Sequence, residues 1–184
     1  SGNSIYYTTD GSEPNSQSNI YTSPVAINSS TVIKAICISN DVTVLPSESV
    51  GKTYLINYQQ TLPVFSISTE PANFFDWNTG IYVSGPNASS VYPYYGSNFW
   101  QDWEIPALVE YFETDGSRKI SQQVGVSIHG GSSNRSKAMK SLRLTNRDSF
   151  GEDDFSYKFF EKKSLDHFKI IVLRNSSGDF NKTH

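Results

Sequence analysis

The stretch Ile5-Tyr-Tyr-Thr-Thr-Asp-Gly-Ser-Glu-Pro14 decides the fold class of the chain. It begins with the alternation typical of a β-strand and passes into Asp-Gly-Ser-Glu-Pro, a dense turn signal. A second run, Thr31-Val-Ile-Lys-Ala-Ile-Cys-Ile38, also has period two. It predicts that the odd-numbered residues 33–37 face a core and that Lys34 faces solvent. Short strands at close spacing, separated by polar turns, favour a small β-sandwich.

The same pattern continues along the chain with one interruption. Gln59-Gln-Thr-Leu-Pro63 is polar and ends in a proline that restricts its neighbour, so we interpret residues 59–63 as a linker. Beyond it, two period-two runs flank Asp115-Gly116, which predicts a tight hairpin. The sequence therefore predicts a mostly-β chain, with an immunoglobulin-like β-sandwich over residues 1–58 and a second β-rich module over residues 64–184.

The composition excludes several classes of protein and site. The chain has 15 Lys+Arg against 18 Asp+Glu, so a nucleic-acid-coating surface is not expected. Its longest apolar runs have only about five residues, which is too short for insertion into a membrane. The single cysteine, Cys37, excludes an internal disulfide and a multi-cysteine zinc site. The three histidines are too far apart in sequence for a metal-binding motif, so no metal site is predicted.

The first candidate binding site follows the run Val124–Ile128. Glycine lets the backbone approach a phosphate, successive N–H groups can form an anion-binding nest, and a lysine on the next strand adds a point charge. An ordinary turn with solvated lysines explains the same residues, and the spacing differs from that of a P-loop. Lys140 and Arg143 have opposite parity, so they share a face only through a bulge or a strand that begins after Lys140. The candidate nucleotide contacts are Gly130, Gly131, Ser132, Ser133, Lys140 and Arg143.

The second candidate site is the aromatic loop, residues 84–103. Aromatic faces stack on sugar rings, so this loop is an alternative carbohydrate-binding platform. A loop that packs on itself and covers a sheet edge has the same composition. The candidate carbohydrate contacts are Tyr94, Tyr95, Trp100 and Trp103.

Residues 1–58 resemble the chitobiase/β-hexosaminidase C-terminal-type module. The resemblance is carried by Ile5–Pro14, with Tyr21, Pro24 and Thr31-Val-Ile-Lys-Ala35. It implies an immunoglobulin- or fibronectin-like accessory sandwich of secreted bacterial proteins. The family pattern has another strand before Ile5, so we expect the chain to be a fragment of a longer protein. Together with the texture rich in Ser, Asn, Thr and Tyr, this indicates an extracytoplasmic bacterial protein, secreted or at the cell surface.

The second module resembles the amino-terminal part of a spore-coat-H-type (CotH) kinase protein. That family is similar to protein kinases, with a β-rich lobe that covers the nucleotide followed by a helical lobe with the acidic catalytic and metal residues. The resemblance implies an incomplete kinase-like N-lobe with Lys140 as its best nucleotide contact. The matching residues are Pro63–Phe75, Thr79–Val83, Trp103–Pro106, Val124–Ser133, Lys140–Leu144 and Phe168–Asn175.

This second resemblance also implies what the chain lacks. The acidic lobe would follow His184, so we assign no catalytic residue to the chain and expect it to be inactive alone. ATP and Mg²⁺ or Mn²⁺ would serve the full-length parent, and the fragment itself is expected to hold no cofactor. The expected partners are a protein substrate of the parent or a cell-surface glycan.

Overall fold

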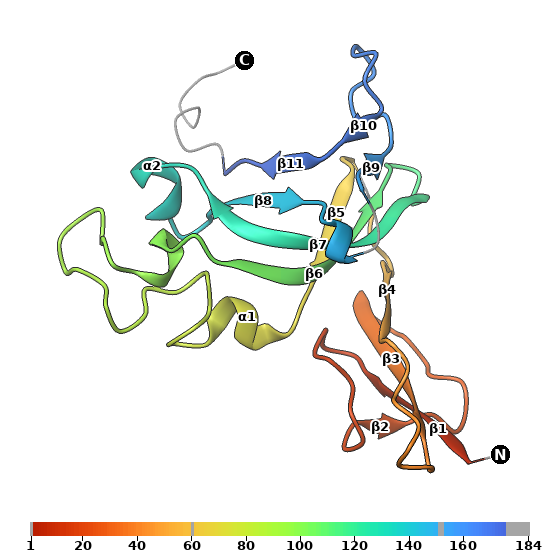
Figure 1. Ribbon diagram of the computed structural model, residues 1–184. Coiled ribbons are helices and arrows are strands. Elements are labelled where there is room, and N and C mark those ends of the chain that lie inside the picture. Colours follow the sequence, from red (N-terminus) through yellow and green to blue (C-terminus); the bar gives the residue numbers. More distant parts are fainter. Residues whose placement is uncertain (1, 60, 151–152, 176–184) are drawn as a thin grey trace. The chain divides into compact units, whose positions relative to one another are not determined.

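The computed structural model describes residues 2–59, 61–150 and 153–175 of the chain (Figure 1). Most of its regular structure is strand, which confirms the mostly-β prediction. The chain divides into two compact units, each built from segments that are distant in sequence. The first unit is Ser1–Glu70 with Leu108–Ser121, and the second is Pro71–Ala107 with Gln122–His184. The first unit continues past residues 59–63, and a division into modules at that linker stays a prediction.

The amino-terminal part of the first unit is a four-stranded sheet in the order β2-β1-β3-β4. The longest pairing joins β1 and β3 antiparallel, from Asn3 opposite Ser39 to Thr8 opposite Lys34. The period-two runs predict both of these strands, because alternating side chains suit a pleated sheet. The strands are β1 (Asn3–Thr8), β2 (Asn19–Ile20), β3 (Thr31–Ser39) and β4 (Val50–Tyr54).

A five-stranded sheet has the order β11-β8-β7-β6-β5. The turn between β6 and β7 is the hairpin that Asp115-Gly116 predicts, and it is confirmed. The Gly116 N–H donates to the Glu113 carbonyl at 2.9 Å, and Gly116 has φ 80°, a conformation that glycine adopts without strain. The strands are β5 (Val64–Ser68), β6 (Glu104–Phe112), β7 (Arg118–His129), β8 (Ser141–Thr145) and β11 (Ile170–Leu173).

Short elements complete the described chain. A two-stranded sheet pairs β9 (Phe155–Ser156) with β10 (His167–Phe168). No helix among the described residues is long and apolar enough to cross a membrane. The helical elements are α1 (Pro71–Phe75), η1 (Asn98–Trp100), α2 (Ser132–Arg135) and η2 (Asp148–Phe150).

Buried apolar side chains are unevenly distributed. Among residues 2–59, Pro14 is the only apolar side chain that is buried, and residues 33, 35 and 37 are half-buried. The buried core residues are Ile81, Phe99, Ile105, Ala107, Leu108, Val109, Tyr111, Phe112, Ile120, Val124, Val126, Ile128, Leu144 and Phe155.

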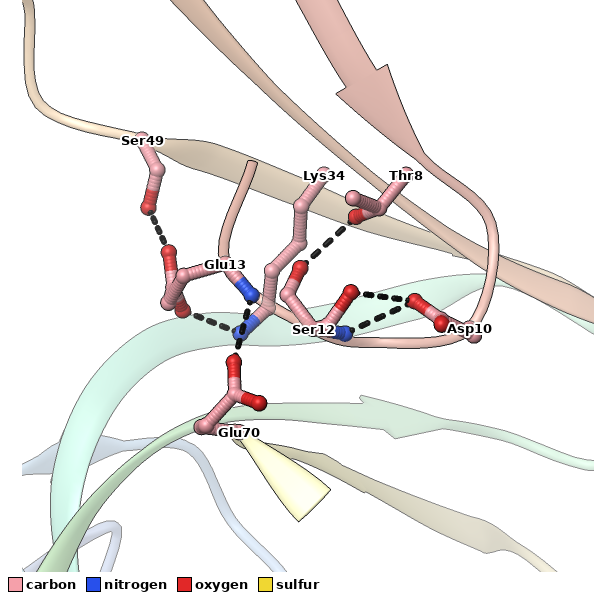
Figure 2. A network of polar contacts seen from close by, with 7 residues as sticks. All are labelled: Thr8, Asp10, Ser12, Glu13, Lys34, Ser49 and Glu70. Carbon is pink, nitrogen blue, oxygen red and sulfur yellow. Dashed lines mark hydrogen bonds and ion pairs between the residues drawn. The ribbon is translucent and has the colours of Figure 1, made fainter. Parts of the chain in front are cut away.

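The prediction that Lys34 faces solvent is wrong. Only 3% of Lys34 is exposed, although it lies in the middle of β3 on the face opposite residues 33 and 35. The physical reason is the turn after β1, which brings the Glu13 carboxylate to the Lys34 ammonium (Figure 2). A lysine stem can pack on a sheet when its ammonium finds a partner at the surface.

Candidate functional site

The turn after β1 holds a network of polar contacts (Figure 2). Asp10 Oδ1 accepts from the Ser12 hydroxyl at 2.5 Å and from the Ser12 N–H at 3.0 Å. Hydrogen bonds from the Ser12 hydroxyl and backbone lower the pKa of Asp10, so its carboxylate stays ionised. The Thr8 hydroxyl donates to the Ser12 carbonyl at 2.7 Å, and Gly11 between them has φ 84°. The Asp-Gly-Ser sequence thus fixes the turn from within.

Glu13 connects this turn to other parts of the first unit. Its carboxylate pairs with Lys34 and accepts from the Ser49 hydroxyl at 2.6 Å, and its N–H donates to Glu70 Oε2 at 2.9 Å. Burial by itself raises the pKa of Glu13, but hydrogen bonds from Lys34 and Ser49 and the Lys34 charge outweigh it, so the pKa is lowered. Both Glu13 carboxylate oxygens already accept hydrogen bonds within the protein, so we interpret this network as a structural contact of the first unit and not as a binding site.

The candidate loop Gly130–Ser133 follows β7 in the second unit. Gly130 has φ 98°, and α2 begins at Ser132. The Gly131 carbonyl accepts the N–H groups of Asn134 and Arg135 at 3.0 and 2.9 Å. The Arg135 side chain reaches back, and its Nε donates to the Gly130 carbonyl at 2.7 Å. These contacts hold the loop in one shape.

Lys140 lies directly before β8 and is 8% exposed. Its ammonium donates to the Lys137 carbonyl at 2.8 Å and lies 4.1 Å from the centre of the Phe99 ring and 5.3 Å from that of Tyr82. Burial lowers the pKa of Lys140. The strand begins at Ser141, as a phosphate-facing lysine would require, yet the ammonium is enclosed by a carbonyl and two rings.

Positive charge gathers around His129 at the end of β7. His129 lies opposite Ser141, and Ser127 lies opposite Arg143, so His129, Ser141 and Arg143 share one face of the sheet. Burial lowers the pKa of His129, and the positive charges of Arg143, Arg135 and Arg174 lower it further. Like charges placed together in this way disfavour a further proton and attract an anion.

The aromatic loop packs partly on itself. The Trp100 indole N–H donates to the Pro93 carbonyl at 2.8 Å, and the Trp100 ring lies 4.8 Å from Tyr95, centre to centre. The Arg135 guanidinium lies over the same Trp100 ring at 5.4 Å. By contrast, the side chains of Tyr94, Tyr95 and Trp103 are exposed to solvent.

The structure thus brings parts of both candidate sets together in the second unit. Arg135 contacts Gly130 of the first set and Trp100 of the second, and its Nη1 donates to the Phe99 carbonyl at 2.6 Å. Arg143 lies on the face of His129 and Ser141, whereas Lys140 has the opposite parity and lies against Phe99. His129 and Arg174 were not among the predicted contacts. The register between paired strands would have indicated these two residues, but a single sequence does not show that register.

Metal ligands are not grouped in the part of the chain that the structure describes. There, no group of three or more His, Cys, Asp or Glu side chains could hold a metal ion.

Comparison with known proteins identifies one region. Residues 1–46 match the family model of the chitobiase/beta-hexosaminidase C-terminal domain, so the predicted resemblance is confirmed over those residues. No curated protein and no solved structure matches the chain. The match covers about a quarter of the chain and includes the turn network around Asp10 and Glu13.

Proposed function

We propose that the second unit provides a phosphate-binding face in a CotH-type, kinase-like protein, with residues 1–58 as an accessory module. The observation that carries this proposal is the positive charge around His129, where Arg143 shares a sheet face with Ser141. A guanidinium offers a planar fork of donors that suits a phosphate. The Ser141 hydroxyl is completely buried and accepts the Asn175 N–H at 3.1 Å, so we do not assign it to phosphate. We assign the phosphate contacts to Arg143 and His129 first.

Lys140 has a different part in this proposal. Its ammonium is enclosed by the Lys137 carbonyl and the rings of Phe99 and Tyr82, which lowers its pKa and removes it from solvent. We therefore infer that Lys140 holds the aromatic loop against the start of β8 and that it reaches a nucleotide only if those rings move. We assign no catalytic residue and no metal ligand to this chain, because phosphoryl transfer needs metal-holding carboxylates opposite the phosphate-binding lobe.

A titration with ATP, ADP and inorganic triphosphate, followed by NMR of the backbone amides, tests the phosphate face. Arg143→Gln should weaken binding about tenfold, because one charge-assisted contact to phosphate is lost. Lys158→Gln removes an exposed positive charge of the same unit that is not among the charges lowering the pKa of His129, and it is the matched control. Equal affinity in the two variants would contradict the assignment. If triphosphate binds as tightly as ATP, the face binds phosphate but the nucleotide part of the proposal is wrong.

The extracytoplasmic location and the partners are parts of the same proposal. The match of residues 1–46 to an accessory-type domain supports a secreted or surface protein. Its parent would act on a protein substrate, with ATP as phosphate donor. Fractionation of the source cells with an antibody against the chain tests the location, and recovery in the cytoplasmic fraction would exclude it.

A second candidate function is binding of a cell-surface glycan through the aromatic loop. The observation in its favour is that Tyr94, Tyr95 and Trp103 are exposed, while Trp100 supports them from within the loop. In a polysaccharide pull-down, Tyr95→Ala and Trp103→Ala should lose binding. Trp77→Ala removes another exposed aromatic ring of the second unit and should retain it. Retained binding in all three variants would exclude the loop as the platform.

A further inference from the structure

A pocket of about 300 Å³ lies within the first unit, between the end of β4 and the turn that joins β6 to β7. Its volume is at the lower end of the range for small-molecule sites. None of its residues belongs to the nucleotide or aromatic-loop candidates, so what it binds is independent of the function proposed above. The lining side chains that matter are Tyr54, Tyr58, Phe112, Thr114 and Asp115, with Gly116 at the turn.

Both walls of this pocket are held in place. The Glu113 N–H donates to the Ser117 carbonyl at 3.0 Å, and Asp115 Oδ1 accepts the Ser117 N–H at 2.8 Å, which fixes the turn. On the other side, the Thr53 N–H at the end of β4 donates at 2.6 Å to Glu110, a side chain of β6 that is 1% exposed. The Thr53 hydroxyl also bonds the Ser66 hydroxyl at 2.7 Å. A pocket with fixed walls loses little entropy when it binds a ligand.

The lining combines aromatic faces with hydrogen-bonding groups. Tyr58 is 56% exposed, whereas Phe112 is 6% exposed and forms an apolar part of the wall. Asp115 and Thr114 add a carboxylate and a hydroxyl at the turn. An apolar ligand would remove the Asp115 carboxylate from water and leave it the Ser117 N–H in place of its water contacts, which is unfavourable, so the lining favours a ligand with both apolar and hydroxyl-bearing surfaces.

Charges around the pocket favour a neutral ligand. Asp115 would repel a phosphate or a carboxylate. Lys119 acts on the Asp115 carboxylate through its charge, and the Lys52 ammonium lies 5.3 Å from the centre of the Tyr54 ring. The Lys119 charge offsets the carboxylate, so a cationic ligand gains little. We propose that this pocket binds a neutral saccharide, with the Tyr58 ring against a face of the sugar and Asp115 and Thr114 bonded to its hydroxyl groups.

Saturation-transfer NMR and calorimetry with cellotriose, chitotriose, xylotriose and mannotriose test this inference on the intact chain. We expect at least one of these neutral probes to bind, and Tyr58→Ala and Asp115→Asn each to weaken it by about fivefold or more. Asp115→Asn retains an oxygen for the Ser117 N–H, so the turn is kept. Thr114→Val, which keeps the side-chain shape, should weaken binding as well.

Matched controls separate this pocket from the rest of the surface. Asp41 accepts the Thr43 N–H in a similar turn at 2.9 Å, so Asp41→Asn reproduces the chemical change elsewhere in the same unit. Tyr21→Ala removes another exposed tyrosine of that unit. Both controls should bind as the parent chain does. The inference is overturned if no probe binds more tightly than about 10 mM, if binding survives Tyr58→Ala and Asp115→Asn, or if Tyr95→Ala in the aromatic loop abolishes it.

Discussion

The pair of Lys34 and Glu13 should respond asymmetrically to substitution. The ammonium belongs to a residue that is 3% exposed, while 49% of the Glu13 side chain is exposed. Removal of the carboxylate leaves a charged group in a site with little access to water. Removal of the ammonium leaves a carboxylate that water can reach. We therefore expect Glu13→Gln to destabilise the first unit more than Lys34→Met does.

The expected magnitudes follow from these exposures. A buried charge that loses its partner costs several kcal/mol, and Glu13→Gln should cost about 3 kcal/mol because Lys34 retains only the amide oxygen as an acceptor. Lys34→Met retains most of the apolar stem and loses a pair with a half-exposed partner, which is worth about 1 kcal/mol or less. The double variant should resemble Lys34→Met, since Glu13→Gln harms the unit only when the buried ammonium is present.

Amide hydrogen exchange measures this difference inside the unit. The amides of β1 and β3 that pair near Lys34, such as Tyr7 and Ala35, report the opening free energy of the sheet. Ser49→Ala, which removes one donor to Glu13 at 2.6 Å and leaves the ion pair, is the control and should cost about 1 kcal/mol. Equal losses in Glu13→Gln and Lys34→Met, or a larger loss in Lys34→Met, would refute this reasoning.

Three further outcomes follow from other polar contacts. The pKa of the Glu13 carboxyl is lowered from 4.5, so its contribution to stability is full above pH 4.5 and is lost as the pH falls through the lowered value. The stability difference between the parent chain and Glu13→Gln, measured by amide exchange between about pH 6 and pH 3, should therefore shrink as the pH falls. A constant difference would contradict this. Glu110→Gln should lower the free energy of unfolding in guanidinium by about 2 kcal/mol. This side chain is 1% exposed and loses charge-assisted hydrogen bonds from Arg118 and the Thr53 N–H, both at 2.6 Å. An unchanged unfolding midpoint would show that the charge of Glu110 is unimportant. In a thermal melt, Trp100→Phe should lower the free energy of unfolding by about 1 kcal/mol, because the 2.8 Å hydrogen bond to the Pro93 carbonyl is lost. Trp103→Phe should change it by no more than about 0.5 kcal/mol. The reverse order would contradict the packing of the loop.

Local sequence signals predicted the parts of the fold that depend on local physics. Asp115-Gly116 produces its hairpin because glycine accepts the positive φ that the turn needs. Parity along β3 correctly separates the face of Lys34 from that of Ile33, but it does not show what covers either face. Glu13 lies 21 residues earlier, and only the folded turn brings it to Lys34. A pattern within one strand therefore predicts orientation and leaves burial open.

The candidate phosphate face shows the same limit between strands. Arg143 was predicted from its own strand, yet His129 joins it only because β7 and β8 pair with Ser127 opposite Arg143. One residue of slip in that register would move every side chain of one strand to the other face. Register is set where one face is buried, and Val124, Val126 and Leu144 are completely buried on the opposite face from Arg143.

The same buried residues explain why the positive charges can be held together. Apolar burial of β7 and β8 on one face fixes both backbones, so the opposite face can carry like charges whose repulsion would otherwise favour separation. Residues 2–59 lack such a core, since Pro14 is the only buried apolar side chain among them. There the contacts of Glu13 with Lys34 and Ser49 specify which turn packs on the sheet, although an apolar side chain in place of Lys34 costs little. The polar contacts of Glu13 thus fix the turn on the amino-terminal sheet, whereas in the second unit the apolar core fixes the strands that carry the positive charges.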